Sequence, residues 1–284
     1  MAALPPYLST PERVWHYAFR VICAAILFFL VFPLIVIIPL SFNAVPFFTF
    51  TEEMLALDPA GYSLEWYRDF FTNVNWQGAV WNSVVIAFFA TLISTSLGTL
   101  AALGLSRPTM PYRTIVMSIL ISPMIVPLII SAAGMFFFYS SIGLQGTHIG
   151  VILAHAALGT PFVVITVTAT LVGFDNNLIR ASSSLGASPV RTFFKVIVPL
   201  ITPGVVSGAL FAFITSFDEV VVVLFVGSFD QRTIPWQMFS GIREQISPTI
   251  LAVATLLTFV SMMLLFTLEL LRRRTERLRG IQET

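Results

Sequence analysis

The feature that most constrains this chain is a run of sixty-one residues, from Thr114 to Phe174, that contains no charged side chain. One transmembrane helix uses about 20 apolar residues, so the run is too long for one crossing and suits two. Three glycines, at positions 143, 146 and 150, interrupt it, and we place the break within residues 140–150. The first of these two spans is therefore expected to end near Tyr139 and the second to cover about Ile149–Gly173.

Four further apolar runs complete the prediction of an all-α integral membrane protein with six transmembrane helices. Only 10% of the residues are charged, against about a quarter in soluble domains. The four runs are Ala18–Leu40, about Val80–Leu105, about Leu200–Val226 and about Pro248–Leu271. Residues 1–17 and 272–284 flank this membrane region of residues 18–271. Prolines within the middle spans are expected to kink them: Pro123, Pro127 and Pro161.

The run at 80–105 is unusually rich in small residues. Such residues let helices approach closely in lipid, which favours a packing face over a substrate path. They are Ser94, Ser96, Gly98, Ala101, Ala102 and Gly104.

The distribution of basic residues predicts the orientation. Twelve basic residues lie on the side of the two termini, against three on the opposite side. Cytoplasmic loops are enriched in Lys and Arg, so both termini are expected in the cytoplasm. The basic tail should anchor the last span at anionic lipid headgroups.

The opposite side begins with a long loop, residues 41–79, that carries five acids and one base. Trp and Tyr side chains lie along this loop and just beyond its end, as suits the membrane interface: Tyr62, Trp66, Tyr67, Trp76 and Trp81. The acids either attract cations, contact a soluble protein or are simply solvated.

The longest polar interruption on the basic side, residues 174–204, is predicted to fold as two short helices. Asp175 and Asn176 are suited to cap a helix that runs through Leu185, and Gly186 provides the backbone freedom to end it. Ser188 before Pro189 is typical of an N-cap followed by a first helical position. The second helix then carries Arg191, Thr192 and Lys195. A segment built in this way is expected to press against another protein.

Several activities are not supported by the residues. The one cysteine, Cys23, excludes an internal disulfide, and the three scattered histidines suggest no metal site. His155, within an apolar run, is expected to form a packing hydrogen bond. The only lysine, Lys195, follows two phenylalanines, whereas a phosphate-binding loop needs a glycine-rich segment before its lysine. The chain is therefore not expected to hydrolyse ATP or to act as an enzyme, and its formal net charge of +1 points to no nucleic-acid partner.

Two acids stand out in the run at 200–226: Asp218 and Glu219. An unpaired charge at bilayer depth costs at least about 2.5 kcal/mol, so each should face a wet cavity or a partner. A cation path could combine such an acid with the ring of Phe217. A structural contact is an equal alternative. Because neighbours on a helix point about 100° apart, only one is expected to line a path, and Asp218 is the first choice.

The 174–204 segment resembles the loop that marks the permease subunits of bacterial binding-protein-dependent ABC importers. In that loop Glu-Ala-Ala is followed after three residues by Gly and, further on, by Leu-Pro. Here the frame is kept by Ala181, Gly186 and Pro199, while Arg180 replaces the usual Glu and Ser182 the second Ala. The resemblance covers about residues 82–273. Segments at 217–221, 233–235 and 246–248 are most similar to the putrescine/spermidine group.

The resemblance implies a multi-pass subunit of the bacterial inner membrane, with the loop between spans four and five coupling it to ATPase subunits. It implies as partners a second homologous permease, two ATPase subunits that bind ATP and Mg²⁺, and a periplasmic solute-binding protein, with no cofactor in this chain. The implied coupling residues are Arg180, Ala181, Ser182, Leu185, Gly186, Ala187 and Pro199. The alternatives are a permease for another small organic solute and an ion-coupled secondary transporter that uses Asp218 or Glu219.

Overall fold

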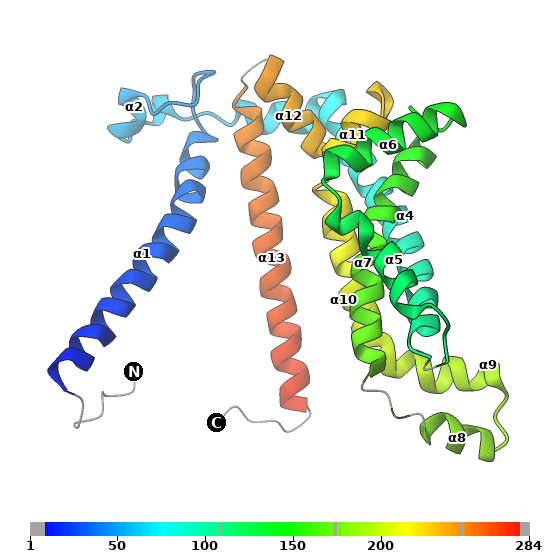
Figure 1. Cartoon of the computed structure of the whole chain (residues 1–284). Coiled ribbons are helices and arrows are strands. Elements are labelled where there is room, and N and C mark those ends of the chain that lie inside the picture. Colours follow the sequence, from blue (N-terminus) through cyan, green and yellow to red (C-terminus); the bar gives the residue numbers. More distant parts are fainter. Residues whose placement is uncertain (1–8, 108, 173–174, 176, 245–246, 279–284) are drawn as a thin grey trace. The chain divides into compact units, whose positions relative to one another are not determined.

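The computed structural model describes residues 9–107, 109–172, 175, 177–244 and 247–278. The described residues form helices and no β-strand (Figure 1). They divide into two compact units, Met1–Asn73 with Gly241–Thr284, and Val74–Ser240. The predicted cap at Asn176, residues 1–8 of the N-terminal segment and residues 279–284 of the tail lie outside the described residues.

The first unit contains the first and last long helices with a folded loop. Its elements are α1 (Thr10–Leu40), α2 (Glu52–Leu55), η1 (Pro59–Gly61), α3 (Glu65–Thr72) and α13 (Thr249–Leu278). α1 begins eight residues before the predicted span, because Glu12 accepts hydrogen bonds from the backbone N–H and hydroxyl of Ser9 at 2.8 and 2.7 Å and so caps it. Thr249 donates to Asp69 at 2.8 Å and joins α13 to α3.

The loop that follows α1 is organised around the side chain of Asn43, which is fully buried. Its amide nitrogen donates to the carbonyls of Phe47 and Thr49 at 3.0 and 2.7 Å, and its amide oxygen accepts from Val45. The indole of Trp66 donates to the Asn43 carbonyl at 2.7 Å. The predicted interface loop is therefore a folded structure that buries its own polar groups.

The second unit is built on three mutually packed helices, α4 (Val74–Leu105), α7 (His148–Val172) and α10 (Val198–Phe217). α4 starts six residues before the predicted span. Trp76 therefore lies on this helix instead of in the loop. Trp76 is buried, and Trp81, also on α4, is exposed. The remaining elements are α5 (Arg113–Ile125), α6 (Leu128–Ser141), α8 (Asn177–Ser184), α9 (Pro189–Thr192), the π-helical turn η2 (Phe193–Ile197), α11 (Val221–Val226), η3 (Phe229–Gln231) and α12 (Ile234–Glu244).

Small residues bring the three helices together, as predicted for α4. A Cβ added at Gly98 of α4 would lie 2.7 Å from the Cβ of Val163 on α7, and one added at Gly208 of α10 would lie 2.8 Å from the Cα of Val163. The hydroxyl of Ser94 donates to the carbonyl of Ala156 at 2.9 Å. A Cβ added at Gly104 would meet no atom within 4 Å. The packing face therefore includes only some of the small residues that were predicted to form it.

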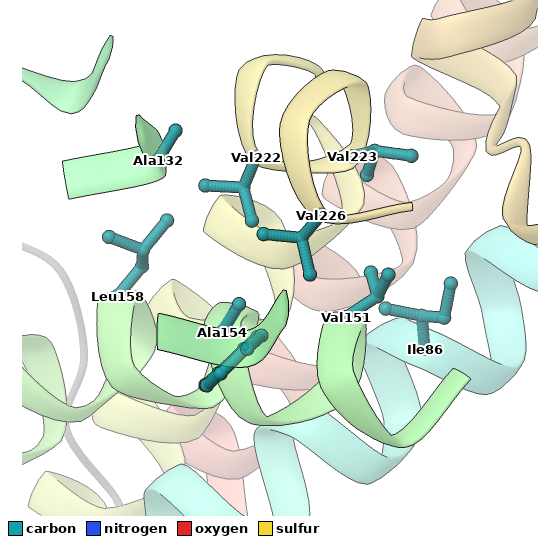
Figure 2. Close-up of a cluster of buried hydrophobic side chains, with 9 residues drawn as sticks. Ile86, Ala132, Val151, Ala154, Leu158, Val222, Val223 and Val226 are labelled. Carbon is teal, nitrogen blue, oxygen red and sulfur yellow. The ribbon is translucent and has the colours of Figure 1, made fainter. Parts of the chain in front are cut away.

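Apolar side chains fill the spaces between these helices. One cluster joins α4, α6, α7 and α11 (Figure 2): Ile86, Ala132, Tyr139, Val151, Ala154, Leu158, Val222, Val223 and Val226. A second joins α4, α7 and α10: Ala102, Val163, Val167, Ile201 and Ala212. The short helix α11 is thus fixed by its buried valines.

The structure confirms part of the predicted membrane topology. By length and composition, α1, α4, α7 and the continuous helix Pro189–Phe217 can each cross a membrane. The predicted third span is broken into α5 and α6, which are bent by 102° at Pro127 and would make a fifth crossing if counted together. The described apolar part of α13, Thr249–Met263, is shorter than these helices. Six crossings and cytoplasmic termini remain predictions.

Candidate functional site

The predicted pair of short helices exists and is joined by a tight turn; we call residues 175–199 the α8–α9 loop. Asp175 accepts the Asn177 N–H at 2.9 Å at the start of α8. α8 ends at Ser184, one residue before the prediction. Gly186 has φ +78°, its N–H donates to the Ser183 carbonyl, and the Ala187 N–H donates to the Ser182 carbonyl. These two bonds form the Schellman motif, which favours glycine at the left-handed position.

The second helix begins as predicted, and one side-chain contact fixes it to the first. The hydroxyl of Ser188 accepts the Arg191 N–H at 3.3 Å and caps α9, with Pro189 in the first turn. The hydroxyls of Ser182 and Thr192 lie 2.8 Å apart and join α8 to α9. Thr192 is buried. Ser182, which departs from the resembled motif, therefore has a structural partner.

The loop continues into α10 without a break in the helix. The turn η2 is π-helical: the Val198 N–H donates to the carbonyl five residues earlier, at Phe193. Pro199 follows directly and has no N–H to donate, and a π-turn is one way in which a helix accommodates such a loss. The α8–α9 loop is thus connected through one continuous helix to Phe217.

The prediction of one continuous span over 200–226 is wrong, because the chain breaks at the other end of α10. The helix ends at Phe217, Asp218 is its C-cap, and a separate helix, α11, begins at Val221. Glu219 is buried, and its carboxylate accepts the Val222 N–H at 2.9 Å at the start of α11. Asp218 is exposed. The two acids differ in burial because they lie in a break between helices. Their difference does not come from their spacing on one helix.

Aromatic and polar contacts stabilise the end of α10 before this break. The rings of Phe213 and Phe217 stack with centroids 5.7 Å apart. His155 of α7 is buried and its Nδ1 lies 2.9 Å from the hydroxyl of Ser216, which confirms the predicted packing hydrogen bond. Within the described residues, no group of three or more His, Cys, Asp or Glu side chains could hold a metal ion.

Sequence reasoning missed a polar network near the N-terminal end of α4, beside η3. Asn82 donates to the carbonyls of Asp230 and Arg232 at 2.7 and 3.0 Å, and its amide oxygen lies 3.0 Å from Nε2 of His148. Nδ1 of His148 lies 3.4 Å from the Gln231 amide nitrogen. These contacts join positions 66 to 150 apart in the chain, and a lone Asn near a helix start gives no signal of them.

The same region contains a stacked arginine. The guanidinium carbon of Arg232 lies 3.7 Å from the ring centroid of Phe229 and 4.2 Å from that of Trp236. The Ile234 N–H donates to the Ser83 hydroxyl at 2.8 Å. The loop between α11 and α12 is therefore fixed to α4.

Comparison with known proteins identifies relatives along most of the chain. Residues 94–277 match the family model described as binding-protein-dependent transport system inner membrane component. The chain is 32% identical over 246 residues to the spermidine/putrescine transport system permease protein PotC of Haemophilus influenzae, covering 87% of this chain and 93% of that protein. It is 29% identical over 236 residues to the putrescine transport system permease protein PotI of Escherichia coli K12, covering 81% of each.

A solved structure supports the fold. A chain in the crystal structure of a bacterial ABC transporter involved in the import of the acidic polysaccharide alginate aligns with a TM-score of 0.70 at 15% identity. The alignment covers 93% of this chain and 98% of that one. At this identity the likeness concerns the fold alone.

Proposed function

The chain belongs to the binding-protein-dependent transport system inner membrane components, and on that premise we propose that it forms the membrane path for a small organic cation, a polyamine such as putrescine or spermidine. It is a permease subunit of an ABC importer in the inner membrane, and its relatives are permeases, not enzymes. ATP hydrolysis belongs to separate ATPase subunits. The similarity to PotC over 87% of the chain is the observation that carries the proposal.

The proposed complex contains this chain, a second homologous permease, two ATPase subunits with bound ATP and Mg²⁺, and a periplasmic solute-binding protein. In this arrangement the termini and the α8–α9 loop are cytoplasmic, consistent with the excess of basic residues on that side. The coupling residues are those of the resembled motif, from Arg180 to Pro199.

The α10–α11 break is the proposed contact with the cation. The Asp218 carboxylate is exposed, and the adjacent ring of Phe217 stacks on Phe213. A carboxylate beside aromatic faces attracts an ammonium group by charge and by cation–π interaction. Glu219 is assigned a different role, since its carboxylate already accepts a backbone N–H at the start of α11.

Coupling is proposed to follow the continuous helix Pro189–Phe217. One end carries the α8–α9 loop and the other ends at Asp218. A movement of the loop, driven by closure of the ATPase subunits, would therefore shift the break and change which side of the membrane it faces. Such a rigid-body shift between two states is a common form of alternating access.

Uptake of labelled putrescine and spermidine tests the proposal. Cells that express the importer subunits with this chain are expected to accumulate both amines, and cells that lack only this chain should not. Equal uptake in the two strains would remove the polyamine assignment. Uptake of another small organic solute that depends on the chain would then identify the alternative substrate class.

A further inference from the structure

We propose that His148 is a positioning residue whose neutral form holds the loop between α11 and α12, and that its protonation at acidic external pH releases this loop and lowers uptake. The α11–α12 loop comprises residues 227–233 and includes η3. This inference rests on the proposed function, which places the loop on the outer side of the membrane, and adds a dependence of uptake on external pH.

The contacts of Asn82 determine the state of one ring nitrogen of His148. The side-chain nitrogen of Asn82 lies 2.7 Å from the carbonyl oxygen of Asp230 and 3.0 Å from that of Arg232. Carbonyl oxygens only accept hydrogen bonds, so the Asn82 atom that faces Nε2 of His148, at 3.0 Å, is the amide oxygen. An amide oxygen also only accepts. Nε2 of His148 therefore carries a hydrogen and donates it.

The contacts of Gln231 determine the other ring nitrogen in the same way. The amide oxygen of Gln231 accepts the backbone N–H of Ser228 at 3.0 Å and the Ser228 hydroxyl at 2.6 Å. The amide nitrogen of Gln231 therefore faces Nδ1 of His148, at 3.4 Å. An amide NH2 group only donates, so Nδ1 must present its lone pair. The network thus accommodates the neutral imidazole with its hydrogen on Nε2.

A second proton on His148 has no acceptor in this network. It would set the N–H at Nδ1 against the NH2 group of Gln231, which is also a donor. Gln231 is 4% exposed, and turning its amide would break both hydrogen bonds to Ser228. His148 itself is exposed, so protons reach it, and histidine is the residue type that becomes charged between about pH 8 and pH 5. Acidic pH therefore favours a loop that is detached from His148.

The charged and titratable groups around His148 belong mainly to the loop itself. α4 and α11 contain none, α6 contains Tyr139, and α12 contains only its last two residues. On α7, His155 lies two turns further along and contacts Ser216. The loop contains the exposed Asp230, and Arg232, whose guanidinium stacks on two rings. The Asp230 carboxylate favours a protonated imidazole and the Arg232 guanidinium opposes it, so a test must remove the carboxylate.

The release is confined to the loop, because α11 is fixed by other contacts. Val222, Val223 and Val226 are buried against α6 and α7 (Figure 2), and the Glu219 carboxylate accepts a hydrogen bond at the start of α11. The loop holds the far end of the same helix, which begins three residues after the proposed cation contact at Asp218. Loss of this attachment therefore lowers uptake while the helices stay packed.

Hydrogen exchange of the complete importer in nanodiscs tests the attachment without a substrate. Protection factors, which remove the intrinsic effect of pH on exchange, should fall about tenfold between about pH 8 and pH 5.5 in the peptide that covers residues 227–233. In His148→Gln they should stay constant, because a glutamine amide still donates to Asn82 and does not titrate. Asp230→Asn is the matched control and should keep the fall.

Each other result of this experiment contradicts the inference. Constant protection in the unmodified chain, or an equal fall in His148→Gln, would show that His148 is not the titrating group. A fall abolished by Asp230→Asn would assign the effect to the carboxylate. Low protection in His148→Gln at both pH values would mean that the imidazole only packs against the loop.

Uptake of labelled putrescine by proteoliposomes, with enclosed ATP and a fixed internal pH, tests the consequence. Putrescine keeps its charge over this range, because alkyl ammonium groups lose their proton near about pH 10. Lowering the external pH from about 8 to 5.5 should reduce uptake severalfold in the unmodified chain and in Asp230→Asn. Uptake should stay constant in His148→Gln and be low at both pH values in His148→Arg, whose charge is permanent.

The two measurements separate failure of this inference from failure of the proposed function. An equal fall of uptake in His148→Gln, or unchanged uptake with a released loop, would overturn the control of uptake by His148. Absence of putrescine uptake in every complex at both pH values would contradict the proposed function. The attachment of the loop by neutral His148 would then stand or fall with the hydrogen-exchange result.

Discussion

The two neighbouring acids at the α10–α11 break are expected to respond differently to substitution. Asp218→Asn should reduce polyamine uptake severalfold and leave the melting temperature unchanged, because the exposed carboxylate has no hydrogen-bond partner among the described residues. Glu219→Ala leaves the Val222 N–H without its acceptor. An unsatisfied buried donor costs about 1–3 kcal/mol, so this variant should melt at a lower temperature. Unchanged uptake by Asp218→Asn would make that residue structural.

Two glycines of α4 allow a matched test of helix packing. A Cβ at Gly98 would meet the side chain of Val163 at 2.7 Å, whereas a Cβ at Gly104 meets nothing within 4 Å. Gly98→Ala should therefore destabilise the chain by about 1–3 kcal/mol through overpacking. Gly104→Ala should be neutral or slightly stabilising, since alanine favours a helix. Thermal melts in detergent measure both changes, and equal melting temperatures would contradict the packing of α4 on α7.

The α8–α9 loop is the element whose local order depends on one pair of hydroxyls. Ser182→Ala removes the partner of Thr192, which is 4% exposed, and so should loosen α8 on α9. Hydrogen exchange of the peptide that covers α8 is expected to accelerate about tenfold, as a loss of about 1.4 kcal/mol implies. Ser183→Ala is the control, because the Ser183 hydroxyl bonds only within α8, to the Ile179 carbonyl. Equal exchange in the two variants would show that the pair does not hold α8.

At the scale of elements, the sequence predicted what local chemistry determines. Asp175, Gly186 and Ser188 set the ends of the two loop helices through hydrogen bonds to residues close by in the chain. The residue types alone were therefore sufficient to predict where these helices begin and end. The break after Phe217 was not predictable in the same way. The residues from 198 to 226 contain two charged side chains, both acids, and no other charge. The separation of α11 depends on the burial of its valines against α6 and α7.

At the scale of the whole molecule, the family was predicted by resemblance, and the tertiary contacts were not. Asn82 and Arg232 lie 150 residues apart, and their hydrogen bond exists only because α4 and the loop before α12 meet. The break in the predicted third span also depends on tertiary contacts. Pro123 and Pro127 predicted a kink, but a bend of 102° reflects packing of α6 against α11 as well as the prolines.

Energy coupling is a property of the whole molecule and gives the last prediction. If the loop and the continuous helix to Phe217 transmit ATPase closure, importer complexes in proteoliposomes should accumulate putrescine with enclosed ATP and no ion gradient. An imposed proton or sodium gradient without ATP should give no accumulation. Proteoliposomes reconstituted from the Gly186→Leu chain and the other importer subunits serve as the control, because this chain keeps the break at Asp218 and has a disrupted turn at residue 186. They should fail to accumulate putrescine in both conditions. Accumulation driven by a gradient alone would instead indicate an ion-coupled carrier that uses Asp218 or Glu219.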